Sequence, residues 1–119
     1  MTGPATIADH VVPTITTAAS DAGRPAPRVV CALPVAVTSD VDGARELAAK
    51  EFAVYGMLPS YRAMLDREGA AGPADVAIVG DAATVRAGIE RVFDSGATEF
   101  VAVTYAERDA TFELLQSML

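Results

Sequence analysis

Residues 28–38, with the sequence RVVCALPVAVT, decide the fold class of this chain. The run is almost continuously apolar and rich in valine, as is typical of a strand that is buried on both faces of a parallel sheet. Pro34 lacks a backbone N–H, which a central strand does not lose freely. We therefore expect a strand over 28–38, with a bulge or a local irregularity at Leu33-Pro34 near its end.

Residues 98–104, TEFVAVT, are a second apolar run and predict a second buried strand. Two buried strands joined by a long helical crossover should be parallel, with a right-handed connection. This pattern indicates the α/β class. Residues 75–79 are interpreted only as a short extended segment. Two strands alone would leave free edges and apolar surface, so we expect the chain to be incomplete or to need a partner.

Helices are expected around these strands, and local signals mark their ends. Apolar periodicity and breakers predict helices over residues 4–22, 41–54, 60–68, 82–95 and 107–119. Asp40 and Asp81 have the side-chain chemistry of N-caps, and Gly23 can end the first helix in a left-handed conformation. Pro13 should kink the first helix or divide it, because it lacks a donor and crowds the preceding turn.

Composition excludes several classes of function. The 119 residues are a one-domain length, and the net charge of -7 with only nine scattered basic residues argues against nucleic-acid binding. One cysteine, Cys31, and one histidine, His10, allow neither an internal disulfide nor a Cys/His zinc site. Without an apolar run long enough to cross a membrane, or a secretory signal, we expect a cytoplasmic protein.

Six stretches together resemble the C-terminal region of luciferase-like monooxygenase-fold proteins. They are TGPATIADHVVPTI at 2–15, GRPAPRVV at 23–30, LPVAVT at 33–38, YGMLPSYRAMLDREG at 55–69, VGDAATVR at 79–86 and DSGATEFVAV at 94–103. None of them is a catalytic signature by itself, but their order and spacing are specific. The closest group within this family is the oxidoreductases that use the deazaflavin coenzyme F-420.

The resemblance implies a (β/α)8 barrel, a fold that typically needs about 250 residues. By analogy, residues 28–38 would be the seventh strand and residues 98–104 the eighth. Residues 40–70 would be an insertion above the C-terminal face, and residues 82–95 a helix outside the barrel. The chain 1–119 would then be a single partial domain. A truncated reading frame and one half of a split gene both fit this expectation.

The same resemblance implies hydride transfer between a reduced cofactor and an organic substrate, with F-420 favoured over FMN and no metal. The cofactor carries the chemistry, while the protein binds and orients it. Gly3, Pro4 and Thr6 open the first helix, where free N–H groups and the helix dipole could bind the cofactor phosphate. A plain helix start is the alternative. No residue qualifies as a general acid or base, so we expect this chain to be inactive alone.

A substrate or cofactor channel is the second site that the resemblance implies. Its candidates are two groups of polar residues: Tyr55, Tyr61 and Arg62 of the insertion, and Thr38, Thr104 and Tyr105 at the strand ends. The alternative is that these residues have no binding role: the tyrosines would pack in the interior, Arg62 would be solvated, and the polar residues at the strand ends would only terminate the strands. Two other functions stay open: a non-catalytic α/β association module or partner subunit of a split barrel, and a small domain that keeps only the phosphate site.

Overall fold

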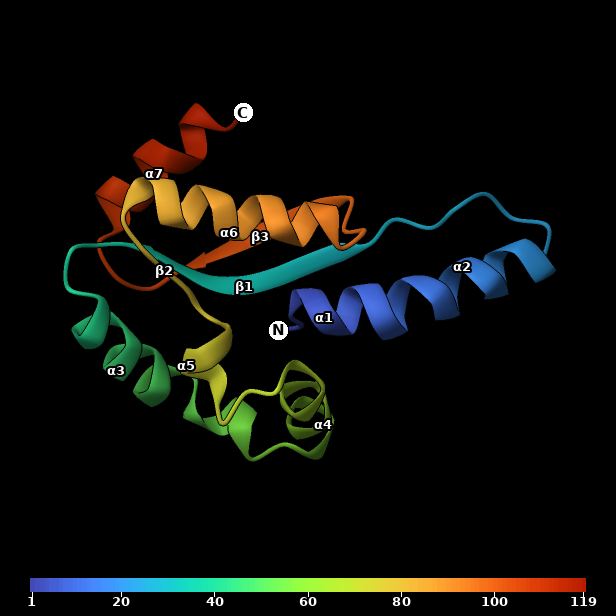
Figure 1. Cartoon of the computed structure of the whole chain (residues 1–119), viewed down its shortest axis with the longest axis horizontal. Coiled ribbons are helices and arrows are strands. Elements are labelled where there is room, and N and C mark those ends of the chain that lie inside the picture. Colours follow the sequence, from blue (N-terminus) through green and yellow to red (C-terminus); the bar gives the residue numbers. More distant parts are fainter.

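The computed structural model describes residues 1–119 and shows a mixed α/β chain built on a three-stranded parallel sheet (Figure 1). The strands are β1 (Val30–Val37), β2 (Ile78–Gly80) and β3 (Glu99–Thr104), in the spatial order β2-β1-β3. β1 pairs with β3 from Val30 to Val35 and with β2 from Val35 to Val37. The predicted α/β class and the parallel pairing of the two long strands are confirmed.

The expectation of only two strands is wrong. Residues 75–79 were interpreted as one extended segment, but Pro73–Val76 form a helical turn, α5, and Ile78–Gly80 form the strand β2. Three residues carry too little periodicity to be recognised as a strand from sequence. They form a strand because they pair with the C-terminal end of β1. One contact beside this pairing is the hydrogen bond that the Thr38 amide donates to the Gly80 carbonyl.

Helices surround the sheet close to the predicted ranges. Their bounds are α1 (Pro4–Thr6), the π-helical turn η1 (Ile7–Val11), α2 (Val12–Asp21), α3 (Val41–Glu51), the 3-10 turn η2 (Ala53–Gly56), α4 (Pro59–Glu68), α6 (Ala82–Asp94) and α7 (Arg108–Ser117). Asp40 and Asp81 cap α3 and α6 by accepting from the Gly43 and Thr84 amides. Gly23, with φ 65°, follows α2 in the left-handed conformation that was expected.

Pro13 lies in the first turn of α2, which is separated from α1 by the π-helical turn η1. The five residues before Val12 form the π-helical turn η1, and α2 begins at Val12, one residue before the proline. A π turn is one residue wider than an α turn, so it leaves room for a ring that cannot donate a hydrogen bond. The expected irregularity is therefore present as a widened turn.

No bulge occurs at Pro34, contrary to expectation, because β1 keeps its register with β3 through Leu33 and Pro34. The Thr38 amide donates toward β2, to the carbonyl of Gly80. Backbone groups alternate in direction along a strand, so the nitrogen of Pro34 faces the same side as that of Thr38. β2 begins only opposite Val35, and the missing donor of Pro34 therefore faces a position without a neighbouring strand.

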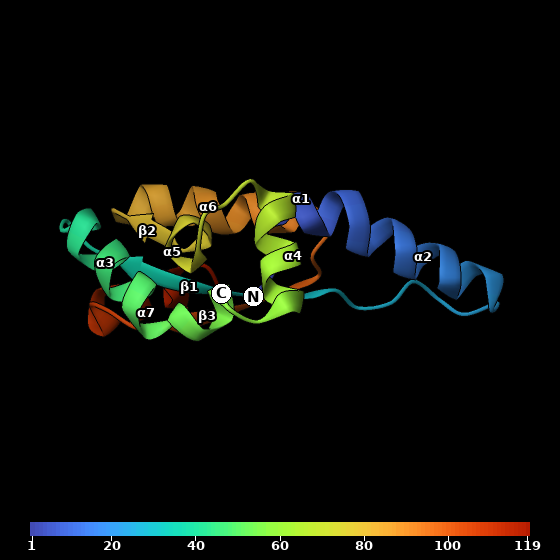
Figure 2. The ribbon, with the colours of Figure 1, turned by 90° about the horizontal axis from the view of Figure 1, so that it is seen from below.

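The two faces of the sheet differ in how far they are covered. Cys31, Leu33 and Val35 of β1 are buried on the side where α6 packs (Figure 2). On the opposite face α3 covers only the C-terminal end of β1, where Ala36 meets Ala44 and Ala48.

Other parts of that face are open, because Val30, Val101 and Val103 are 54%, 49% and 38% exposed, although Pro34 of β1 is buried. The prediction of a buried strand over 98–104 is therefore wrong: no residue of β3 is buried, and no element covers the face that carries Val101 and Val103. The molecule is thin, with extents of 47 × 34 × 17 Å, and α2 projects beyond the sheet without burying any of its residues (Figures 1 and 2).

Candidate functional site

The start of the first helix, predicted to bind a cofactor phosphate, holds an internal carboxylate. Glu68, the last residue of α4, accepts a hydrogen bond of 2.7 Å from the Thr6 amide to Oε1 and one of 3.3 Å from the Ala5 amide to Oε2. An anion at a helix start is favoured by the free N–H groups and the helix dipole. The amide groups that were assigned to phosphate thus bind the chain's own anion.

Gly3 makes this contact possible. A Cβ atom added to Gly3 would lie 2.6 Å from Oε1 of Glu68, and nearer still to its Cδ atom. The backbone angle φ of Gly3 is -82°, which any residue can adopt. A glycine is therefore required here for close approach of the carboxylate, and not for its conformational freedom.

Thr6 is buried beside this carboxylate and has one unpaired polar atom. The residue is 5% exposed, and its Oγ1 is the only buried side-chain oxygen or nitrogen of the chain without a hydrogen-bond partner. An unpaired buried hydroxyl destabilises a fold by about 1–3 kcal/mol. The helix start thus has one polar group that a ligand could still satisfy.

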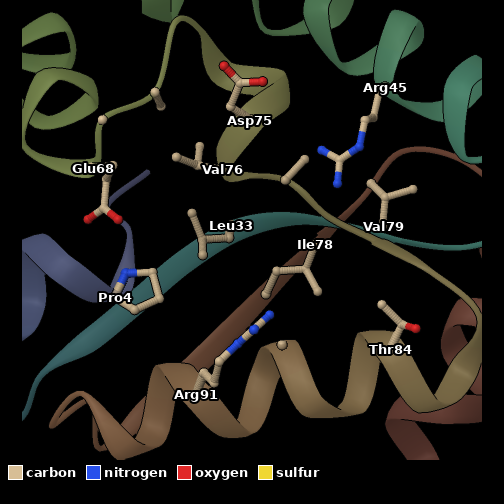
Figure 3. A pocket seen from close by; sticks show the side chains of 14 residues that line it. Pro4, Leu33, Arg45, Glu68, Asp75, Val76, Ile78, Val79, Thr84 and Arg91 are labelled. Carbon is tan, nitrogen blue, oxygen red and sulfur yellow. The ribbon is translucent and has the colours of Figure 1, made fainter.

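A cavity of about 360 Å³ adjoins the carboxylate of Glu68 (Figure 3). Pro4 and Glu68 line it on one side, and Leu33 and Ile78 form its apolar floor. Two arginines complete the wall, Arg45 from α3 and Arg91 from α6, and both side chains extend toward the hollow in Figure 3. The site therefore combines an apolar floor with two cationic groups and two carboxylates, those of Glu68 and Asp75.

None of the six channel candidates lines this cavity. Arg62 donates to Asp66 at 2.9 Å and to the carbonyl oxygens of Ala70 and Ala71 at 2.7 and 2.8 Å. Its guanidinium donors are thus occupied by Asp66 and by the loop that follows α4, which Arg62 holds in place. Tyr61 packs against Tyr55 with ring centroids 4.7 Å apart.

Tyr105 also has an internal partner. Its hydroxyl donates to the Ala44 carbonyl at 2.9 Å, and its ring packs edge-on against Phe52 at 5.5 Å. Burial raises the pKa of the Tyr105 hydroxyl above its ordinary value, while the charge of Arg45 acts in the opposite direction. Phe52 and Tyr55 connect Tyr105 to Tyr61, so the tyrosines lie in one row of packed rings that joins α3, α4 and the end of β3.

The two strand-end threonines lie apart from one another. Thr104 pairs with Val35, whereas Thr38 follows the end of β1 and accepts a hydrogen bond from the Asp40 amide. β1 therefore extends beyond the end of β3, whereas β1 and β2 end together at Val37 and Gly80. Cys31 is 1% exposed, and burial raises the pKa of its thiol to about 11, which makes a nucleophilic thiolate rare near neutral pH.

Sequence reasoning missed Glu68, Arg45, Gly88 and Arg91. Glu68 was not found because it caps a helix start 62 residues away, and no local pattern encodes that pairing. A weak signal existed for Arg91: Gly88 and Arg91 share one face of the helix predicted over 82–95, and a glycine in a helix interior indicates close packing.

Comparisons with known proteins found no matching family model, no matching curated protein and no matching solved structure. No helix of the chain has both the length and the apolar character that a membrane crossing requires. No group of three or more His, Cys, Asp or Glu side chains is arranged to hold a metal ion.

Proposed function

We propose that the chain is the C-terminal part of a luciferase-like (β/α)8 barrel oxidoreductase that transfers hydride between coenzyme F-420, or less favourably FMN, and an organic substrate. One observation carries this proposal: β1 and β3 are adjacent parallel strands with α6 on one face and exposed valines on the other. In a barrel, crossover helices lie outside and branched apolar side chains fill the interior. Val30, Val101 and Val103 would then face the barrel interior.

The free strand edges support the same proposal. The outer edge of β3 pairs with no strand. The edge of β1 that faces away from β3 is unpaired from Val30 to Pro34. A barrel would use both edges, because every strand of a closed sheet pairs on both sides. β2 already pairs with Val35–Val37, so a sixth barrel strand would pair only with the first half of β1.

In this proposal the cofactor phosphate binds at Gly3, Pro4 and Thr6. The bound cofactor supplies the hydride chemistry, and this chain contributes the N–H groups of Ala5 and Thr6 and the unpaired Thr6 hydroxyl. Glu68 must leave these amides before a phosphate can bind them, since both anions need the same donors. Tyr61, Arg62 and Tyr105 have no role here, because their polar groups or rings contact other parts of the chain.

A titration of the chain with F-420 and with FMN, followed by cofactor fluorescence, tests the phosphate site. We expect Glu68→Gln to strengthen binding, because it removes the competing negative charge, and Thr6→Val to weaken it. Glu90→Gln is the matched control, because this substitution removes the same negative charge at an exposed position of α6, away from the helix start. The absence of binding by either cofactor at high micromolar concentration would contradict the proposed phosphate site.

The barrel itself is tested by the genomic sequence upstream of the first codon. An in-frame extension or an adjacent gene that encodes six further βα units would support the C-terminal assignment. Upstream sequence without such units would contradict it. This result does not depend on the cofactor titration, so the two parts of the proposal can fail separately.

A second candidate function is association without catalysis, favoured by the uncovered surface around β3. The accessible surface is 6834 Å², whereas a compact monomer of this mass exposes about 6,100 Å². The excess is similar to the roughly 800 Å² that one partner buries in a standard interface. Val101 and Val103 are exposed on one side of the β3 edge, and an apolar hollow that includes Phe93 and Phe112 flanks the other.

Sedimentation of the purified chain distinguishes this candidate. A self-associating module should sediment as a dimer or larger species, and Val101→Lys should return it to a monomer. Thr17→Lys, which adds the same charge on an exposed position of α2, is the control and should not change the assembly. A monomer at all concentrations would rule out self-association.

A further inference from the structure

The cavity between α1, α5, β2 and α6 carries an inference that does not depend on the barrel proposal. We infer that it binds a small oxyanion with phosphate chemistry, either free phosphate or the phosphate group of a larger molecule, through Arg91 and Arg45. Its volume of about 360 Å³ falls within the range of about 300–1,000 Å³ found for small-molecule sites.

The first support is the face that α6 presents to the cavity. Thr84, Gly88 and Arg91 follow one another at i, i+4 and i+7, so they share one side of the helix, and all three line the hollow. A Cβ on Gly88 would lie 2.5 Å from Cγ2 of Ile78, so the glycine allows α6 to lie directly against β2. This close packing positions Arg91 at the edge of the cavity floor.

The second support is that the guanidinium of Arg91 has no partner. It makes no hydrogen bond and no ion pair within the chain, while its side chain extends along the cavity between Pro4 and Ile78 in Figure 3. A guanidinium carries five donors arranged as a planar fork that matches carboxylate and phosphate oxygens. Arg91 is therefore free to bind an anion from one side.

Arg45 approaches from the opposite wall. Its Nη1 donates to the Ala74 carbonyl at 2.6 Å, which holds the side chain in place, and no acidic group pairs with it. The guanidinium is directed toward the hollow in Figure 3. Two of the nine basic residues of a chain with net charge -7 thus line one small cavity.

The acidic side chains that line the cavity are engaged by backbone amides and not by these arginines. Glu68 accepts from the Ala5 and Thr6 amides, and Asp75 Oδ2 accepts from the Ala71 and Gly72 amides at 2.8 and 3.3 Å. Hydrogen bonds between ionised partners are stronger than neutral ones. An oxyanion with two or more free oxygens would therefore find charged donors here that the protein leaves unused.

An NMR titration of the isotope-labelled chain with inorganic phosphate, at constant ionic strength against chloride, tests this inference. We expect the Arg91 side-chain Nε–H signal and the Gly88 and Ile78 amide signals to shift together and to saturate. Arg91→Gln should weaken phosphate binding at least tenfold, and Arg45→Gln should weaken it as well. Absence of saturable shifts at these positions would overturn the inference.

Arg24→Gln is the matched control, because it removes the same charge from an exposed connector far along the chain from the cavity. If it weakens binding as much as Arg91→Gln, the effect is a general charge effect and the site is refuted. Arg91 also lies in the last turn of α6, where a cation stabilises the helix. All variants are therefore compared at a temperature where their spectra show folded protein.

Ribose 5-phosphate distinguishes the two sources of the anion. Tighter binding of the ester than of inorganic phosphate assigns the site to a phosphorylated molecule, and equal binding assigns it to the free ion; both outcomes support the site. Phosphate shifts confined to the Ala5 and Thr6 amides, where the proposed function places the cofactor phosphate, would instead put the anion at the helix start and overturn the cavity site. Failure of this site and failure of the cofactor site are thereby distinguished.

Discussion

A side chain on residue 3 and the carboxylate of Glu68 would occupy the same space. Gly3 leaves that space empty, and Glu68 fills it to bind the amides of Ala5 and Thr6. The contact joins α4 to the first helix across more than 60 positions of the chain. It therefore has both a structural role, as a helix cap, and a functional consequence, because it occupies the donors that an anionic ligand would need.

Gly3→Ala should expel the Glu68 carboxylate from the helix start. We expect the free energy of unfolding, measured in urea, to fall by about 1–2 kcal/mol, the typical effect of losing a helix cap. Glu68→Ala should have a similar effect, and the double variant should be no less stable than either single one, because both remove the same contact. Gly72→Ala is the control, since nothing lies near its added methyl group. Fully additive losses would contradict the contact.

Thr6→Val should stabilise the protein. The substitution keeps the shape of the side chain and removes a buried hydroxyl that has no partner, so we expect a gain of about 1 kcal/mol in urea unfolding. Thr111→Val is the matched control and should instead lower the free energy of unfolding. The Thr111 hydroxyl is fully buried, donates to the Glu107 carbonyl and accepts from the Val37 amide. Equal destabilisation by both variants would show that Thr6 is also hydrogen-bonded.

Gly88→Ala should destabilise the packing of α6 against β2. The new methyl group would lie 2.5 Å from Cγ2 of Ile78, and overpacking of this kind typically lowers stability by about 1–3 kcal/mol. Ile78→Ala in the same chain removes the obstructing atom and should recover part of the loss. Thermal unfolding measured by circular dichroism compares the four proteins of this cycle. A Gly88→Ala variant as stable as the parent would refute the close contact.

Cys31 should make stability fall at alkaline pH. Its folded pKa of about 11 lies above the ordinary value of 9.0, chiefly because of burial. Between these values the unfolded chain loses the thiol proton and the folded chain keeps it, so stability is complete below about pH 9 and declines toward pH 11. Urea unfolding from pH 7 to pH 10.5 should show a steeper decline for the parent than for Cys31→Ala. Identical slopes would contradict the shifted pKa.

Local chemistry accounts for the parts of the fold that the sequence predicted correctly. The apolar runs around Cys31 and Val101 indicate strands, and the caps Asp40 and Asp81 act within three residues of their own positions. Errors occurred where a neighbour in space decides the outcome. Pro34 stays in register because β2 begins one residue later, and β3 has an exposed face because no element packs there.

The candidate site was predictable only in part, for the same reason. Gly3 and Thr6 were identified from the start of the first helix, but Glu68 could not be, because its role depends on how α4 approaches that helix. Arg91 has an ordinary position near the end of a helix in the sequence. It becomes a binding candidate only because Gly88 brings α6 against Ile78 and leaves a cavity beside it.

By itself, the sequence determined the α/β class, the order of the two long strands and the longer helices, and the N-caps Asp40 and Asp81, because periodicity and capping act over one or two turns of the chain. Only the tertiary structure decided that Ile78–Gly80 form a strand, that Glu68 occupies the amides of the first helix and that Arg91 and Arg45 line one cavity. These contacts join residues far apart in the chain, and their geometry depends on how whole elements pack.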